Sequence, residues 1–110
     1  KNATAVTIMD GIVSRITFIP VLGNTILIDH GDDYKTIYSN IEGTIIEDKN
    51  GIKTIYSNTD DSIFVSESQY VSNKFKIGII GVNSDGENTL HFQIWYKDIM
   101  LNPEQWLIKK

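Results

Sequence analysis

The segment 89–95 carries the side chains of this sequence that are best suited to form a functional site. In an extended strand, successive side chains point to opposite faces, so Leu90, Phe92 and Ile94 should form an apolar core face. The opposite face would carry a single histidine among neutral and aromatic side chains: Thr89, His91, Gln93 and Trp95. An imidazole can bind a metal or transfer a proton, but a catalytic zinc site also needs further ligands. A lone strand histidine is more often packed or hydrogen-bonded, and this alternative stays open.

Composition limits the classes of protein that this sequence can encode. The 110 residues fit one domain, and 41% hydrophobic residues suffice for one core. Abundant Ile, Val and Thr favour strands over helices. The net charge of −4 and the single arginine, Arg15, argue against nucleic-acid binding. The absence of cysteine excludes disulfides and thiolate metal sites, and no apolar run approaches the ~20 residues of a membrane span.

Short apolar runs separated by turn residues predict an all-β fold, a twisted antiparallel sheet or β-sandwich. The expected strands are 6–9, 12–19, 25–29, 34–38 and 77–82. Asp10-Gly11 predicts a tight hairpin between the first two strands. Asn102 and Pro103 predict a short helical turn over residues 102–106, capped by Asn102.

The sequence also contains one internal repeat. Residues 25–40 recur at residues 44–58, and the pentapeptide Thr-Ile-Tyr-Ser-Asn is identical in both copies. Asn50-Gly51 is a strong hairpin signal in the second copy. A duplicated hairpin explains the pattern, and we expect it to extend one sheet with Tyr38 and Tyr56 on the same face. The alternative is that the second copy is a tolerated insertion without function.

Several motifs, in their order and spacing, resemble the lysostaphin/LytM-type metallopeptidases along nearly the whole chain. The corresponding segments are 10–13, 23–31, 38–41, 65–78, 89–95 and 101–107. Residues 38–41 stand where the family has Tyr-Ala-His-Leu, and residues 89–93 where it has His-x-His-Phe-Glu. Ser68 replaces a family glycine. The resemblance implies the LytM-type fold, with strands supported by the sequence itself.

The departures from the family pattern concern the zinc site. The family holds zinc through His, Asp and His, and a histidine serves as base for the attacking water. His91 matches the downstream ligand, whereas Thr89 and Asn40 stand where the family has histidines. The upstream His and Asp would precede Lys1. We therefore expect a catalytically inactive domain with no metal and no cofactor.

Among degenerate relatives, the pattern is most similar to murein hydrolase activators of the EnvC type, which bind and activate a cell-wall amidase in peptidoglycan remodelling and cell division. This resemblance implies a domain spanning residues 1–110, the C-terminal part of a longer exported protein, in the periplasm or cell envelope, with membrane contact only through upstream regions or a partner. The expected partner-binding groove comprises Tyr38, Asn40, Thr89, His91, Gln93 and Trp95. Two alternatives stay open: a non-hydrolytic peptidoglycan-binding module and a scaffold in an envelope complex.

Overall fold

The computed structural model describes residues 3–56 and 63–101. This part of the chain forms twelve strands and no helix. The strands are β1 (Thr4–Val6), β2 (Gly11–Ile19), β3 (Gly23–Gly31), β4 (Tyr34–Ser39), β5 (Ile41–Glu42), β6 (Thr44–Glu47), β7 (Lys53–Tyr56), β8 (Ile63–Ser66), β9 (Tyr70–Val71), β10 (Lys76–Ile80), β11 (His91–Tyr96) and β12 (Ile99–Leu101). The expected helical turn at residues 102–106 lies outside the described residues. Among those described, no helix could cross a membrane.

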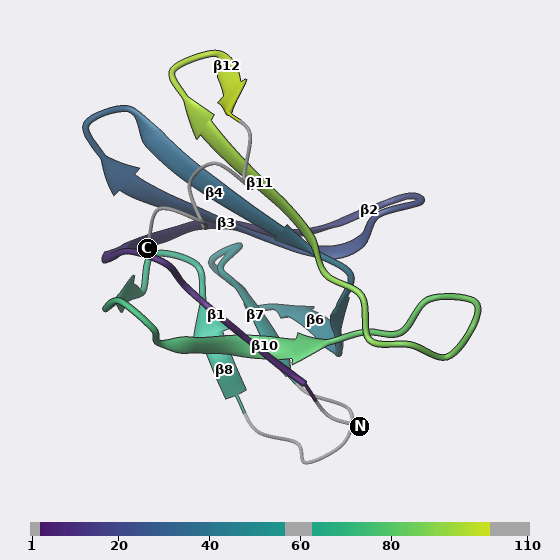
Figure 1. The fold of residues 1–110 in the computed structure, drawn as a ribbon. Coiled ribbons are helices and arrows are strands. Elements are labelled where there is room, and N and C mark those ends of the chain that lie inside the picture. Colours follow the sequence, from purple (N-terminus) through teal and green to yellow (C-terminus); the bar gives the residue numbers. More distant parts are fainter. Residues whose placement is uncertain (1–2, 57–62, 102–110) are drawn as a thin grey trace.

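The strands form three antiparallel sheets. The largest has six strands in the order β12-β11-β4-β3-β2-β9, and the other two are β1-β10-β5 and β6-β7-β8. Figure 1 shows the six-stranded sheet above β1 and β10, so two layers enclose the core between them. This arrangement confirms the expected all-β fold of antiparallel sheets.

Alternation along the central strands fills this core. Ile26 and Ile28 of β3 are fully buried, whereas Leu27 between them is only half-buried. The strand period of two therefore gives the six-stranded sheet a core face and an outer face. The buried cluster draws on all three sheets: Ala5, Val13, Ile16, Ile26, Ile28, Tyr38, Ile41, Ile55, Val65, Val71 and Ile77.

The prediction of a hairpin at Asp10-Gly11 is wrong. β1 pairs with β10, and β2 pairs with β3 and β9, so the Asp10-Gly11 segment connects two sheets. Gly11 is required for space: a Cβ there would lie 2.7 Å from the Asp29 carbonyl oxygen and 2.9 Å from His30 Nδ1. The dipeptide that signals a tight turn here marks a close approach between strands.

The two copies of the repeat both form antiparallel hairpins, β3–β4 and β6–β7, but they do not lie in one sheet. The two hairpins differ in register by one residue. Thr36 pairs with Ile28, the fourth residue of the repeat that begins at residue 25, whereas Thr54 pairs with Ile46, the third residue of the repeat that begins at residue 44. A slip of one residue exchanges the two faces of a strand. As a result, the tyrosine of the pentapeptide, Tyr38, is buried in the first copy. In the second copy the preceding isoleucine, Ile55, is buried, and Tyr56 is only half-buried. The expectation that both tyrosines share one face is wrong.

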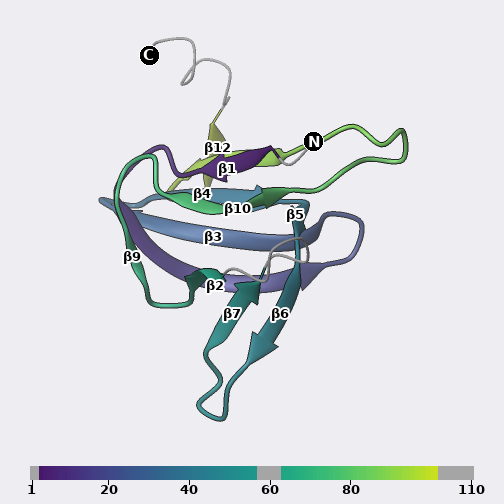
Figure 2. The same ribbon diagram turned by 90° about the horizontal axis from the view of Figure 1, so that it is seen from below.

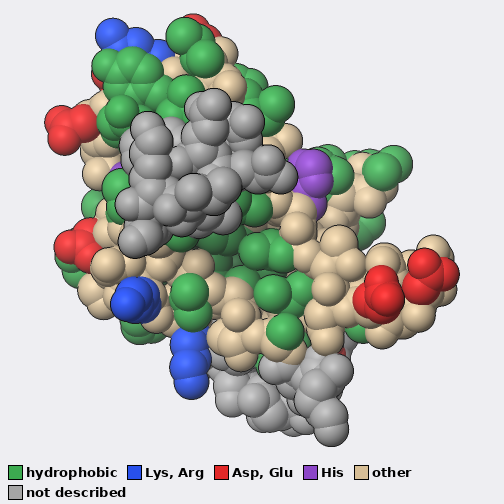
Figure 3. Space-filling view, in the orientation of Figure 1, with side chains coloured by type: hydrophobic (Ala, Val, Ile, Leu, Met, Phe, Trp, Pro, Cys, Tyr) green, Lys and Arg blue, Asp and Glu red, His purple; other side chains and the backbone are tan. Residues whose placement is uncertain are grey.

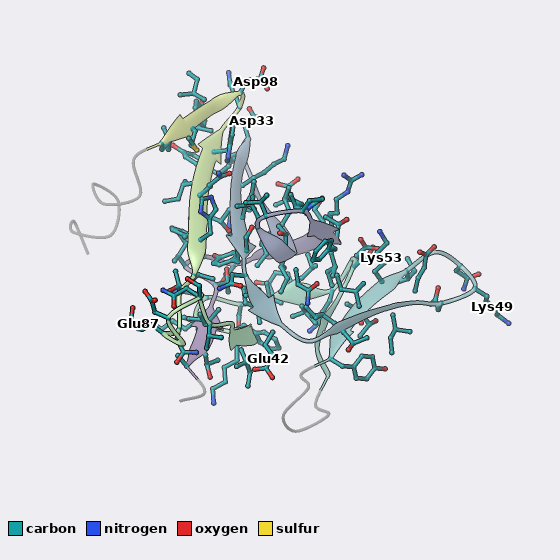
Figure 4. The ribbon with its side chains drawn as sticks, turned by 90° about the vertical axis from the view of Figure 1, so that its right-hand side faces the viewer. Asp33, Glu42, Lys49, Lys53, Glu87 and Asp98 are labelled. Atoms are coloured by element: carbon teal, nitrogen blue, oxygen red, sulfur yellow. The ribbon has the colours of Figure 1, made fainter. Side chains whose placement is uncertain are left out.

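The second hairpin projects from the body of the protein, as Figure 2 shows for β6 and β7. Its base is anchored by the Glu67 carboxylate, which accepts hydrogen bonds from the main-chain N–H of Ile16 (2.8 Å) and of Lys53 (3.0 Å). One side chain thereby joins β2 to β7. Figure 4 shows Lys49 at the tip of this hairpin, far from Asp33 and Asp98, which lie together at another end of the molecule.

Candidate functional site

Three side chains of β11 form a hydrogen-bonded row on the outer face of the six-stranded sheet. Trp95 Nε1 donates to Gln93 Oε1 at 3.0 Å. Gln93 Nε2 then donates to His91 Nε2 at 3.2 Å, since an amide nitrogen cannot accept. On the other face of the strand, Ile94 is fully buried and Phe92 packs against the core. The two faces predicted for this strand are therefore confirmed.

Asn40 and Thr89 lie beside this row and are bonded to each other. Asn40 Nδ2 donates to the Thr89 carbonyl oxygen at 2.6 Å, and the Asn40 carbonyl accepts from the Gly81 N–H at 2.7 Å. The Thr89 N–H donates to the Gly81 carbonyl at 2.9 Å. Thr89 precedes β11, and its hydroxyl donates to the Glu87 carbonyl at 3.3 Å. These bonds fix the loop between β10 and β11 against the end of β4.

Tyr38 does not join the other expected groove residues. Its relative exposure is 1%, and its ring packs against Phe92 on the core face, with 5.2 Å between ring centroids. It therefore cannot contact a partner on the outer face. The other five expected groove residues are accessible to solvent. Thr89 and His91 are exposed, whereas Asn40, Gln93 and Trp95 are half-buried.

The Tyr38 hydroxyl belongs to a polar network that the sequence did not predict; it is buried at Tyr38 and reaches the surface at Asp10. His30 Nδ1 bonds the Asp10 carbonyl at 2.8 Å, and its Nε2 bonds Thr36 Oγ1 at 2.7 Å. Thr36 Oγ1 lies 3.0 Å from the Tyr38 hydroxyl. The expected strand 25–29 ended before His30, so the role of this residue was missed. His30 lies in β3 and holds the segment before β2.

The outer face around the β11 row is amphipathic. Strand pairing places Gln93, Ile37, Leu27 and Arg15 in one cross-strand row. Trp95 faces Lys35 across the strands, and His91 faces Ser39, which is fully buried. Figure 3 shows apolar side chains over the β11–β12 region and acidic ones on the loop between β10 and β11. An aromatic side chain, aliphatic area and neutral hydrogen-bonding groups thus lie together, which suits macromolecular contact.

The residues present do not fit a catalytic zinc centre. Such a centre needs three protein ligands and an open position for water. Within residues 3–56 and 63–101, no group of three or more His, Cys, Asp or Glu side chains is close enough to hold a metal. His91 Nε2 is engaged by Gln93, and His30 is engaged on both nitrogens within the network around Tyr38.

Comparison with known proteins finds relatives that include murein hydrolase activators. No protein-family model matches the sequence. The chain is 30% identical over 105 residues to the uncharacterized protein NMB1333 of Neisseria meningitidis serogroup B, which covers 96% of the chain and 14% of that protein. It is 31% identical over 85 residues to the murein hydrolase activator NlpD of Escherichia coli K12, covering 77% of the chain and 17% of NlpD. The chain therefore spans less than a fifth of the length of these relatives.

Solved structures share the fold. A chain of the crystal structure of the SpoIIIAH–SpoIIQ complex superposes with a TM-score of 0.69 at 23% identity, over 96% of this chain and 63% of that one. A zinc-containing peptidase from Vibrio cholerae superposes with a TM-score of 0.58 at 25% identity, over 84% of this chain and 23% of the peptidase. The fold is LytM-like. The activator found by similarity is NlpD, which agrees in part with the resemblance to EnvC-type activators.

Proposed function

We propose that this LytM-like domain is non-catalytic and that it binds and activates a cell-wall amidase in the periplasm or cell envelope. The observation that carries the proposal is the hydrogen-bonded row of Trp95, Gln93 and His91, displayed on a sheet whose opposite face already forms the core. A half-exposed tryptophan with a fixed orientation is a plausible anchor for a protein partner. The similarity to the murein hydrolase activator NlpD supports this choice of partner.

Two further points support a protein partner over a glycan. The neighbouring outer-face residues Leu27 and Ile37 offer aliphatic area, as interface centres usually do. A structural neighbour of the same fold is part of a protein–protein complex, that of SpoIIIAH and SpoIIQ. A peptidoglycan-binding module and an envelope scaffold remain as the outcomes that a negative activation test would favour.

The non-catalytic part of the proposal is tested by metal analysis of the purified protein. One matched ligand, His91, is too few for a zinc hydrolase, so we expect far less than one zinc per chain and no peptidoglycan hydrolysis. About one zinc per chain, lost in His91→Ala, would overturn this part.

The partner is tested by amidase activation with the wild type and with Trp95→Ala. Truncation of an anchor tryptophan costs ~2 kcal/mol or more, which corresponds to roughly 30-fold weaker binding. Phe18→Ala is the matched control, because Phe18 is 62% exposed on β2, away from β11. Circular dichroism and denaturant unfolding report whether each variant folds.

Three outcomes separate the alternatives. Loss of activation in Trp95→Ala with normal activation in Phe18→Ala supports the proposal. Equal activation by both variants removes Trp95 as the anchor. No activation by the wild type, with co-sedimentation of the domain and purified peptidoglycan, would assign the domain to glycan binding.

A further inference from the structure

A second candidate site lies on the six-stranded sheet, at β2 and β3, toward its β9 edge. A surface pocket of about 460 Å³ opens between β2, β3 and the loop that joins β8 to β9. Its walls come from Ile12, Val13, Ser14, Asp29, Gly31 and Ser68. This volume lies within the range of small-molecule sites. None of these lining residues belongs to β11. Trp95 pairs with Lys35 and Lys35 with Asp29, so the pocket and the Trp95 row lie on the same face of the sheet with β4 between them.

Two β-bulges border this pocket. The pairing of β2 with β3 shifts between Val13 and Arg15, which leaves Ser14 as the extra residue. The pairing of β3 with β4 shifts between Asp29 and Gly31, which leaves His30 as the extra residue. Bulges re-aim side chains and are over-represented beside functional sites. The extra residue Ser14, which is exposed, and the half-buried Asp29, which precedes the second bulge, both line the pocket.

Ser68 adds a strained backbone to the same pocket. Its φ of 74° lies in the left-handed region, where a side chain is costly and glycine is the usual residue. Its N–H donates to the Val13 carbonyl at 2.6 Å, which holds the loop against β2. A serine at this position keeps a hydroxyl in the pocket wall at an energetic cost, and such strain tends to persist where the side chain has a use.

The charges around the pocket favour a neutral ligand. Asp29 is the carboxylate among the lining residues, and one of its oxygens accepts from the Gly31 N–H at 2.9 Å. Lys35 faces Asp29 across the strands. A cationic ligand would be repelled by Lys35, and an anionic ligand by Asp29.

The polar and apolar groups match a sugar ring. The Asp29 carboxylate accepts hydrogen bonds, and the Ser14 and Ser68 hydroxyls both donate and accept, which suits ligand hydroxyls. Ile12 is 49% exposed, and its cross-strand neighbour Tyr70 is 61% exposed. Ile12 offers an apolar wall in the pocket, and Tyr70 lies next to it on β9. We infer that this pocket binds a neutral saccharide.

The test is an NMR titration of the whole chain with two soluble neutral probes, chitotriose and cellotriose. We expect saturable amide shifts centred on Ile12, Gly31 and Ser68 with at least one probe. Ser68→Gly should weaken binding about five-fold or more, the effect of one lost hydrogen bond. It should unfold at an equal or higher temperature, because glycine relieves the left-handed strain.

Lys74→Gly is the matched control, because Lys74 also has a left-handed φ, 68°, but lines no part of the pocket. Its binding should equal that of the wild type. Asp29→Asn, which keeps a carbonyl oxygen for the Gly31 N–H, should weaken binding without unfolding the chain. The inference fails if neither probe gives a saturable shift, if Ser68→Gly binds as the wild type does, or if the shifts centre on 91–95 instead. Amidase activation is measured separately with Trp95→Ala, so either proposal can fail alone.

Discussion

The side-chain amide of Asn40 donates a 2.6 Å hydrogen bond to the main-chain carbonyl of Thr89. By the resemblance to LytM-type peptidases, these two residues stand at positions where the family has histidines. In this chain the pair joins the end of β4 to the segment before β11. Asn40 also adopts a left-handed φ of 66°, which asparagine tolerates better than most residues. The two positions thus serve the architecture of the outer face.

We expect Asn40→Ala to lower the free energy of unfolding by about 2 kcal/mol, from the lost hydrogen bond and the left-handed φ. Asn40→Gly should cost only about half as much, because glycine adopts this φ without strain. Urea denaturation of both variants measures the difference. Equal costs would show that the backbone conformation contributes nothing.

The repeat supplies a second comparison, between Tyr38 and Tyr56. Both occupy the same place in an identical pentapeptide, but only Tyr38 is buried. Tyr38→Ala should cost about 3–5 kcal/mol, as for other large-to-small core substitutions, and Tyr56→Ala less than half of that. Chemical denaturation decides the point. Similar losses in the two variants would contradict the one-residue difference in register.

These results show how far local pattern predicts this fold. The two faces of β11 were predictable because alternation is a property of the strand itself. The sheet assignment of the second hairpin was not, because its register depends on contacts with β8 and on the Glu67 carboxylate. Asp10-Gly11 has the composition of a turn, but β1 finds its partner in β10, about seventy residues later. The burial of Tyr38 likewise depends on tertiary packing.

The pocket beside Ser68 could not be predicted for a related reason. A β-bulge is defined by the pairing of two strands, so the extra residues Ser14 and His30 are visible only once the partners are known. One signal was present in the sequence. Ser68 replaces a glycine of the family pattern, and the structure gives it a left-handed backbone.

Glu67 should contribute strongly to the attachment of the second hairpin. Its two carboxylate oxygens accept main-chain hydrogen bonds from Ile16 and Lys53. In Glu67→Gln an NH2 group would replace one acceptor, so we expect a loss of about 1–2 kcal/mol in unfolding free energy. Glu47→Gln, at an exposed acid of β6, should change it little. Hydrogen exchange of β7 gives the local readout; unchanged protection in Glu67→Gln would refute the anchoring role.

Our last prediction concerns pH and the phenol of Tyr70. Desolvation raises the pKa of Tyr70 above its usual 10.0, and the nearby Asp10 carboxylate raises it further through its charge and a hydrogen bond. A raised pKa in the folded state means that the unfolded chain ionises first as pH increases. The contribution of Tyr70 to stability is therefore complete below pH 10.0 and is lost as pH rises through the folded-state pKa.

Asp10→Asn removes the charge and keeps a carbonyl oxygen for the Asn73 N–H. It should lower the pKa of Tyr70, which an NMR titration of the phenol carbon measures, and weaken the fall in stability above pH 10.0. Asp85→Asn, on the loop between β10 and β11, should leave the titration of Tyr70 unchanged. An unaltered pKa in Asp10→Asn would show that desolvation alone sets the shift.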